Sequence, residues 1–453
     1  MSTSPSRRKR DERIHVTQVK VTKLNGSLNY TIPCHESGVT LITGPNGYGK
    51  TSIIKLLDAI FSLNFQIFNQ IAFDVFEVKL SSGVKLQVRQ VARPDVDSPS
   101  VVLSLVDGRR KEESELIPLR PLIFDEDVLY SSGRNISERE RERLLRNFVA
   151  HGQIERIGPQ RYRTPEGELL TTEGVFRRFP FLKSEALRIS VPPWFAEVID
   201  AFNIDFLNAQ RLHDTSDKSA VDLVASVIRS DIQSARNIHG DLSQKLDRQF
   251  PNELLTATRL KNLKPEELQK MLETLSDRWA LLRQLGLLFD DFSLPPVQQT
   301  SAVKRQIAGA YLRGLAKKLT AFDDIEPRMS LFRALINEHF ELNKTLEYSR
   351  ERGIEITDAR GRVVPLNRLS SGEQHLLVLF GNLLFGPSRP SLVLIDEPEL
   401  SLHPSWQLSF LSSIERIKQV VKVDFILATH APAMVVDHKH LMFDMWEAQN
   451  GGS

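Results

Sequence analysis

The clearest chemistry in the sequence lies in residues 44–51, Gly-Pro-Asn-Gly-Tyr-Gly-Lys-Thr, which match the pattern G-x-x-x-x-G-K-[ST]. Glycines at these spacings let backbone N–H groups turn inward around a phosphate, at the amino end of a helix that already favours anions. Lys50 can reach the outer phosphate oxygens, and the Thr51 hydroxyl suits Mg²⁺. An apolar segment at 39–43 and a helical pattern at 52–61 supply the required strand and helix. These residues therefore predict a phosphate-binding loop.

A second apolar segment, residues 391–395, is followed directly by two carboxylates, Asp396 and Glu397. Buried strands rarely end in two acids unless there is a cation or a proton to handle. Asp396 suits Mg²⁺, directly or through water, and Glu397 suits polarising a water that attacks a phosphate. The alternative interpretation is an acid-rich amino terminus of a helix.

A third apolar segment, residues 425–429, ends at His430. A single histidine after a strand is usually structural. Here it follows the acidic pair at a spacing that suits a third motif of one site. We therefore expect His430 to hydrogen-bond the outermost phosphate or the attacking water.

Residues 369–374, Leu-Ser-Ser-Gly-Glu-Gln, place hydroxyls and a glycine amide at the start of a helix, which predicts a second anion site. One nucleotide bound to one domain needs only one triphosphate-binding site. Two copies that face each other can use both sites, because each can close the phosphate loop of the other. The sequence therefore predicts a dimer with nucleotide held between the copies.

Hydropathy patterns divide the chain into a split α/β domain with a helical insertion. Period-two alternation predicts strands in the first part of the chain, at residues 15–23, 28–32, 75–80 and 84–91. Helical stripes begin after residue 215, and no heptad pattern persists long enough to predict a long coiled-coil arm. The predicted division is a disordered basic tail at 1–13, an N-terminal lobe at 14–212 with an insert at about 134–188, a helical insertion at 213–350, a C-terminal lobe at 351–446 and a tail at 447–453.

Composition describes an ordinary globular protein. The chain has 453 residues, a net charge of +2 and 41% hydrophobic residues, which excludes a disordered chain and a strongly cationic nucleic-acid coat. No apolar run is long enough to span a bilayer. The only cysteine, Cys34, cannot form an internal disulfide, so we expect a buried thiol in a cytoplasmic protein without a membrane partner.

Taken together, the motifs resemble those of an ATP-binding-cassette (ABC) ATPase head of the soluble SMC, RecF and overcoming-lysogenisation-defect (OLD) type. In that resemblance residues 44–51 correspond to Walker A, 369–373 to the signature and 392–397 to Walker B. Ser401 and His403 resemble the D-loop in the variant that these soluble families use, and His430 resembles the switch histidine. The likeness covers about residues 14–130 and 190–440.

The resemblance implies an α/β fold, namely a split ABC ATPase head of the P-loop NTPase class with an α-helical insertion and a small β-hairpin insert. ATP and Mg²⁺ are the implied cofactors, and Gln210, just before the helical insertion, is the implied Q-loop residue that binds Mg²⁺ or water. The expected catalytic residues are Glu397 and His430, and the expected metal ligands are Thr51, Gln210 and Asp396. The expected nucleotide-binding residues are Gly44, Asn46, Gly47, Gly49, Lys50, Thr51, Ser52, Gln210, Ser370, Ser371, Gly372, Glu373, Ser401 and His403.

The motif variants are similar to those of ATPases from prokaryotic anti-phage systems, most of all to the stand-alone ATPase subunit of two-gene systems (AriA of PARIS, with PtuA of Septu as the alternative). This likeness implies a slow, regulatory ATPase that acts as sensor and scaffold in abortive infection. The implied partners are a second copy of the chain, in a head-to-head dimer or a higher homo-oligomer, a separately encoded effector such as a nuclease, and a phage-encoded trigger. OLD-type proteins carry a nuclease domain after the ATPase, and the residues after His430 are too few for one.

Two other functions remain open from the sequence. A RecF- or SMC-like DNA-repair ATPase would bind DNA, although the nearly neutral charge argues against a dedicated DNA clamp. A nucleotide switch that serves mainly as an assembly scaffold is the other.

Overall fold

A computed structural model describes residues 13–62, 67–91, 100–108, 110–116, 145–146, 149, 154–158, 161–163, 169–171, 175, 194–195, 198, 202, 204–208, 219–256, 264–290, 301–340, 344–386 and 391–450. The chain divides into two compact units. The first comprises Met1–His213 and Pro387–Ser453, and the second comprises Asp214–Gly386. The basic tail at 1–13 and the insert at 134–188 were predicted in regions that lie mostly outside the described residues.

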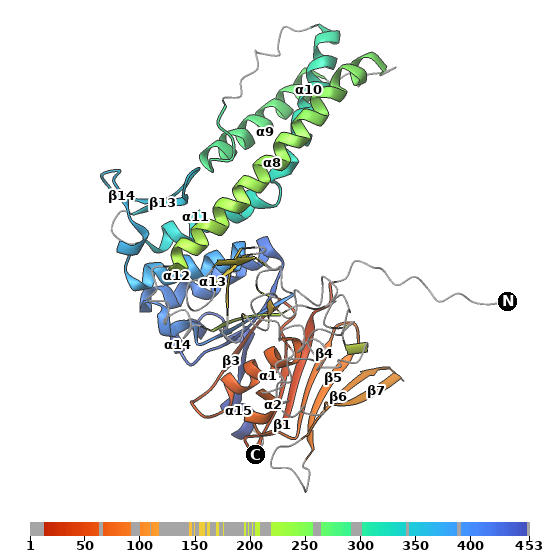
Figure 1. The fold of residues 1–453 in the computed structure, drawn as a ribbon, viewed down its shortest axis with the longest axis vertical. Helices are drawn as coiled ribbons and strands as arrows, with labels where there is room; N and C mark the ends of the chain where they lie inside the picture. Colours follow the sequence, from red (N-terminus) through yellow and green to blue (C-terminus); the bar gives the residue numbers. More distant parts are fainter. Residues whose placement is uncertain are drawn as a thin grey trace, which may run out of the picture. The chain divides into compact units, whose positions relative to one another are not determined.

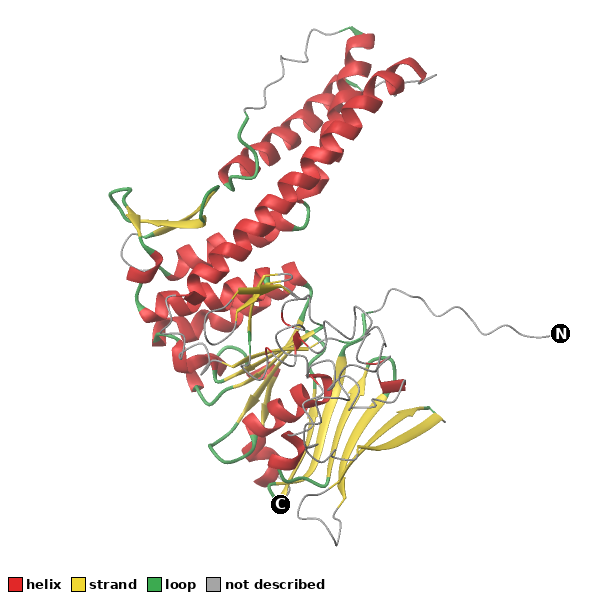
Figure 2. Ribbon diagram, in the orientation of Figure 1, coloured by secondary structure: helices red, strands yellow, loops and turns green. Residues whose placement is uncertain are grey.

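A five-stranded parallel sheet forms the centre of the first unit (Figures 1 and 2). Its strand order is β11 (Ile204–Asn208), β15 (Leu392–Asp396), β16 (Asp424–Ala428), β3 (Val39–Thr43) and β17 (Met442–Asp444). Every neighbouring pair is parallel. All residues of β3 and β15 are buried, as the continuous apolar runs predicted, because both faces of a parallel sheet are covered.

An antiparallel sheet, whose strands come before and after β3 in the chain, shares a hydrophobic core with the parallel sheet. The strand order is β2 (Leu28–Pro33), β1 (Val16–Leu24), β4 (Val75–Leu80), β5 (Lys85–Val91), β6 (Ser100–Asp107) and β7 (Arg110–Leu116). The strands predicted at residues 75–80 and 84–91 are confirmed as β4 and β5, which pair antiparallel as a hairpin. Helix α1 (Lys50–Ser62) packs on β11, β15 and β16, and its apolar residues belong to one hydrophobic cluster with β1, β4 and β5. Helix α2 (Ile67–Gln70) follows it.

The remaining elements of the first unit are short. The small sheet β8 (Glu155–Gly158), β9 (Arg161–Arg163) and β10 (Leu169–Thr171) contains the predicted hairpin, since Arg163 pairs with Leu169. After β15 come η5 (Pro398–Ser401), α13 (Pro404–Val421), α14 (Pro432–Val435), η6 (Lys439–Leu441) and α15 (Met445–Asn450). Helix α15 includes the first residues of the region predicted as a tail, 447–453, and Gln449 of this helix donates a hydrogen bond to the Asn29 carbonyl.

The second unit is mainly helical, as predicted. It contains α8 (Ser219–Thr256), α9 (Pro265–Gln284), α10 (Ala302–Leu319), η3 (Thr320–Phe322), α11 (Ile325–His339), η4 (Leu366–Arg368) and α12 (Ser371–Phe385). A small antiparallel sheet joins β12 (Thr345–Ser349), β13 (Gly353–Thr357) and β14 (Val363–Val364). Pro265 is the first residue of α9, and Gly286, at φ +66°, follows the end of that helix. Helix α8 is a single helix of 38 residues that packs along α10 and α12 (Figure 1).

The second unit ends at Gly386, whereas the sequence-based division ended the helical insertion at residue 350. The difference arises because α12 packs closely on α8: a Cβ atom placed on Gly381 would lie 2.3 Å from Cγ1 of Val224. Helical periodicity predicts that a helix forms but does not say which neighbour it covers. Among the described helices, none is both long and apolar enough to cross a membrane.

The α8–α12 contact gives a test that separates packing from helix propensity. We expect Gly381→Ala to lower the free energy of unfolding by about 1–3 kcal/mol, because the added methyl group must displace Val224 even though alanine favours helices. The matched control is Gly240→Ala in α8, where no atom lies within 4 Å of the added Cβ, so stability should rise by up to about 1 kcal/mol. Urea denaturation of the two variants measures both changes. Stabilisation by both substitutions would contradict the close packing.

Candidate active site

The parallel register brings three of the predicted motifs to one edge of the central sheet. Asp396 is the last residue of β15 and pairs with Ala428 at the end of β16. Ala428 pairs in turn with Ile42, next to the end of β3. Because parallel strands end at the same edge, the phosphate loop, the acidic pair and Thr429-His430 all leave the sheet at that edge.

The loop of residues 44–49 has the backbone geometry that its glycines allow. Gly44, Gly47 and Gly49 have φ values of +144°, +85° and +92°, a region in which other residues are strained. A side chain on Gly49 would also collide with Leu24 of β1, 2.5 Å away. The antiparallel sheet thus supports the loop from behind, and this contact could not be read from the sequence.

Tyr30 of β2 provides a second support for the same loop. Its hydroxyl donates a 3.0 Å hydrogen bond to the Tyr48 carbonyl. Burial raises the pKa of Tyr30 to about 12, so the hydroxyl keeps its proton and remains a donor at any physiological pH. Asn46 and Gly47, at the tip of the loop, are exposed and accessible to a ligand.

Lys50, the first residue of α1, is buried with only 5% of its surface exposed. Its ammonium donates hydrogen bonds to the carbonyls of Gly44 (2.6 Å) and Pro45 (3.1 Å), which closes the loop on itself. Burial lowers the pKa of Lys50, and the nearby carboxylates of Glu397, Glu399 and Asp396 oppose that shift. The cation is therefore held inside the loop, where phosphate oxygens would replace the carbonyls as its acceptors. Ser52, in the first turn of α1, is partly exposed.

Thr51 and Asp396 lie in direct contact, as the predicted metal site requires. The Thr51 hydroxyl donates a 3.2 Å hydrogen bond to Oδ1 of Asp396. Burial, against the opposing effect of the Thr51 hydrogen bond and aided by the negative charge of Glu397, raises the pKa of Asp396 to about 6. A hydroxyl and a carboxylate are the hard oxygen donors that Mg²⁺ prefers, so this donor pair fits the ion. Gln210, the third predicted ligand, lies outside the described residues.

Glu397 and His430 stand beside this pair. Glu397 has left-handed backbone angles (φ 50°, ψ 53°), which are strained for a residue with a side chain. Its N–H donates to the Ala428 carbonyl at 2.9 Å, which extends the ladder between β15 and β16 past Asp396. Oε1 of Glu397 lies 3.8 Å from Nδ1 of His430. The two predicted catalytic side chains are thus neighbours.

Glu399 is a third acid of this group, and the sequence analysis assigned it no role. Only 6% of its surface is exposed, and its Oε1 accepts a 2.8 Å hydrogen bond from the backbone N–H of His430. The same oxygen lies 3.1 Å from Nδ1 of the His430 ring. An acid three residues after Asp396 is the only trace of this arrangement in the sequence, and it is too common to single out.

The predicted signature motif belongs to the second unit. Ser370 caps the amino terminus of α12: its hydroxyl accepts from the Glu373 N–H, and the Glu373 carboxylate accepts from the Ser370 N–H at 2.8 Å. Both oxygens of Glu373 also lie 2.8 Å from the ammonium of Lys344, which the sequence analysis missed. Burial by itself would raise the pKa of Glu373. The hydrogen bonds from Lys344 and Ser370 outweigh burial, so the pKa is lowered. Glu373 therefore fixes the loop, whereas Ser371 and Gly372 supply amides at the helix start.

The predicted D-loop residues lie at the start of α13. His403 is the N-cap of α13, and its Nδ1 lies 2.7 Å from the Ser405 hydroxyl. Ser401 ends η5, and its side chain is not described. His403 is exposed, so its ring is accessible to a ligand or to another chain.

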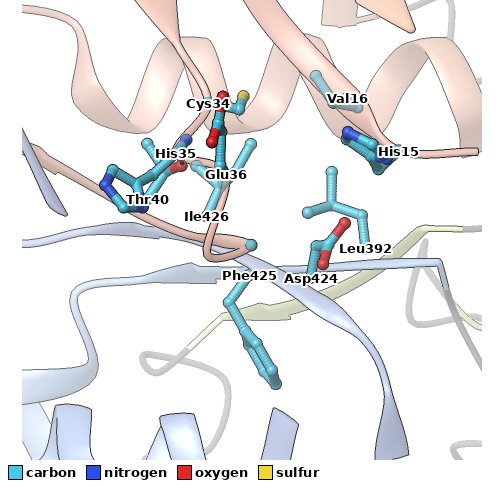
Figure 3. A pocket seen from close by; sticks show the side chains of 11 residues that line it. His15, Val16, Cys34, His35, Glu36, Thr40, Leu392, Asp424, Phe425 and Ile426 are labelled. Carbon is cyan, nitrogen blue, oxygen red and sulfur yellow. Dashed lines mark hydrogen bonds between the residues drawn. The ribbon is translucent and has the colours of Figure 1, made fainter. Parts of the chain in front are cut away.

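A pocket of about 80 Å³ lies elsewhere in the first unit (Figure 3). Its lining includes residues near the amino ends of strands, among them Thr40, Leu392 and Asp424, so it lies at the edge opposite to the phosphate loop. Cys34 lines it and is partly buried; burial, aided by Asp424, raises the pKa of the thiol to about 12. Nucleotide pockets are several times larger, so this pocket is unsuited to ATP.

Comparisons with known proteins relate parts of the chain to a family of AAA domains and to proteins named as probable retron ATPases. Residues 264–437 match the family described as "AAA domain, putative AbiEii toxin, Type IV TA system". The chain is 32% identical over 107 residues to "Retron Ec83 probable ATPase" of Escherichia coli, which is 21% of this chain and 19% of that protein. It is 27% identical over 145 residues to "Retron Vc95 probable ATPase" of Vibrio cholerae serotype O1 biovar El Tor, which is 28% of each. The chain thus spans about a fifth to a quarter of these relatives.

Among solved structures, the chain is similar to the Smc head domain of Pyrococcus furiosus bound to the C-terminal domain of ScpA, with 14% identity, a TM-score of 0.33 and coverage of 94% of this chain and 92% of that chain. The SMC head domain from Thermotoga maritima gives 12% identity, a TM-score of 0.31 and coverage of 94% and 92%. The strand order, and not these low TM-scores, shows the fold. The first unit is α/β, with the parallel sheet and phosphate loop of an ABC-ATPase-like P-loop fold.

The raised pKa of Asp396 predicts that the ionised carboxylate, which a metal site needs, lowers the stability of the ligand-free protein. A carboxyl whose folded-state pKa exceeds its unfolded value of 3.8 favours folding below that value, and this contribution is lost as the pH rises through about 6. We therefore expect Asp396→Asn to stabilise the protein without nucleotide or Mg²⁺, by up to about 3 kcal/mol above pH 6 and by less towards pH 4. Denaturation at pH 8 and pH 5 measures the difference. A gain that does not depend on pH would show that the carboxyl charge is not the cause.

Proposed function

We propose that this chain binds ATP with Mg²⁺ and hydrolyses the nucleotide. One observation carries the proposal: Thr51 and Asp396 are in contact beside the buried ammonium of Lys50, at the sheet edge where Glu397 and His430 also lie. The names of the two relatives, both "probable ATPase", support it.

Each residue has a definite part in this proposal. The amides of the loop and Lys50 hold the phosphates, and Thr51 and Asp396 would hold Mg²⁺, which when bound neutralises charge on phosphate oxygens. Glu397 can accept a hydrogen bond from the attacking water, which orients that water. His430 can bond either the outermost phosphate or the same water.

We further propose that the active form is a dimer with nucleotide between two copies. The amino terminus of α12, with Ser370, Ser371 and Gly372, offers N–H groups and hydroxyls to an anion. In a dimer this end of α12 in one copy would complete the phosphate site of the other. The contacts of Glu373 with Ser370 and Lys344 support the idea, because they hold the loop ready before any ligand arrives.

For the biological role, we propose a slow, regulatory ATPase that senses a phage-encoded trigger and controls a separately encoded effector. The motif variants described above favour this role. So do the matched toxin-family description and the two retron relatives. The effector is expected to be a nuclease.

The Glu397→Gln variant tests hydrolysis and dimerisation together. The amide keeps the size of the side chain but cannot polarise water, so we expect ATP binding to persist while kcat falls by at least about 100-fold. The nucleotide-bound dimer should then accumulate, as measured by light scattering with ATP and Mg²⁺.

Lys50→Ala is the matched control, because it removes the ammonium that holds the phosphates and should abolish both nucleotide binding and the dimer. Wild-type turnover by Glu397→Gln would refute the assignment of Glu397, and unchanged nucleotide affinity of Lys50→Ala would refute the phosphate loop.

The proposed control of an effector can be tested with the protein encoded by the neighbouring gene. We expect its product to co-purify with the wild-type chain and to be released, or activated, when ATP is hydrolysed. Co-purification from cells that express both genes, with wild type and Glu397→Gln compared, measures this. Absence of any complex, together with hydrolysis that DNA stimulates at least tenfold, would instead favour a DNA-repair ATPase.

A further inference from the structure

We propose that Glu399 is a positioning residue that sets the tautomer and the orientation of the His430 ring. The inference rests on the proposed ATPase function and adds a residue to its machinery. Glu399 lies in η5, two residues after the strained Glu397, and its side chain turns back towards the end of β16.

Two contacts hold His430 against this carboxylate. Oε1 of Glu399 accepts a 2.8 Å hydrogen bond from the backbone N–H of His430 and lies 3.1 Å from Nδ1 of its ring. An ionised carboxylate can only accept hydrogen bonds, so Nδ1 carries the proton. The second ring nitrogen, Nε2, is then left for the ligand. The backbone contact fixes the position of the residue, and the ring contact fixes its rotation and tautomer.

Burial of Glu399 strengthens its hold on the His430 ring. The Glu399 side chain is 5% exposed, and its Oε2 is buried without a hydrogen-bond partner among the described residues. The negative charges of Asp396 and Glu397 lie close by, and so does the positive charge of Lys50. The N–H donors of His430 contact Oε1 directly, so rotation of the ring away from Glu399 would leave this buried carboxylate with one donor fewer. The buried acid therefore restrains the imidazole more strongly than an exposed one could.

This arrangement separates the roles of the two nearby acids. Glu397 is 20% exposed, and its Oε1 lies 3.8 Å from Nδ1, beyond hydrogen-bond distance. Glu399 occupies Nδ1 at 3.1 Å. Without Glu399, the His430 ring could rotate and donate its Nδ1 proton to Glu397. The Glu397 carboxylate would then no longer be able to accept a hydrogen bond from the attacking water. Glu399 thus keeps the two catalytic groups from neutralising each other.

The test replaces Glu399 by Leu, which has a similar size but no acceptor for Nδ1, because the wild-type acceptor of both His430 contacts is the single oxygen Oε1. A neutral imidazole without such an acceptor prefers its proton on Nε2, so the ring should change to that tautomer. Nitrogen NMR of ¹⁵N-histidine-labelled protein without nucleotide measures this, with the His430 signals identified by their loss in His430→Ala. We expect a protonated Nδ1 in the wild type and a protonated Nε2 in Glu399→Leu. An Nε2-protonated wild type would overturn the proposal, whether or not the protein hydrolyses ATP.

Steady-state kinetics tests the consequence. We expect Glu399→Leu to lower kcat at least tenfold while KM for ATP changes less than threefold, because the ring is misdirected and the phosphate loop is intact. In a His430→Ala background the same substitution should have no further effect. The control Glu447→Gln, an exposed acid of α15, should match the wild type. An equal loss of kcat with and without His430 would overturn the proposal, whereas no wild-type hydrolysis would overturn the proposed function and leave the NMR result to decide.

Discussion

The candidate site depends above all on the register of three parallel strands. β15, β16 and β3 are apolar and buried, and their pairing brings Asp396, Ala428 and Ile42 to one level. The chemistry lies just beyond that level, where the chain leaves the sheet. A slip of one residue in any of these strands would turn its side chains to the other face, so the hydrophobic interior of the sheet fixes the positions of the polar groups at its edge.

That edge is electrostatically unfavourable without a ligand. The buried carboxyl of Asp396 has a raised pKa, Lys50 is buried with a lowered one, and Glu397 has strained backbone angles. Strain and desolvation of this kind concentrate at functional sites, where a ligand relieves them. A cation beside Asp396 and phosphate oxygens beside Lys50 would each replace a poor contact by a better one. The conflict therefore supports a nucleotide and metal site more strongly than any single distance does.

The second unit fixes its own loop in a different way. Ser370 and Glu373 cap α12 reciprocally, and Lys344 pairs with Glu373 from the start of β12. Farther along α12, Gly381 permits close packing on α8. The loop at 369–373 is thus attached to a rigid framework that includes the 38-residue helix α8. Any ligand that contacts this loop also contacts a helix end whose geometry is set by packing.

Local patterns in the sequence were enough to predict the elements and the motifs. The phosphate loop, the acidic strand end, the hairpin at 75–91 and the helices after residue 215 follow from patterns of a few neighbouring residues, and the structure forms them. Tertiary structure alone decided the support of Gly49 by Leu24, the pairing of Lys344 with Glu373, the contact of Glu399 with His430 and the membership of α12 in the helical unit. These are contacts between residues that are remote in the chain. Periodicity and motif spacing predict which helix, strand or loop a segment forms. Which segments then lie beside it depends on packing and on the burial of charge.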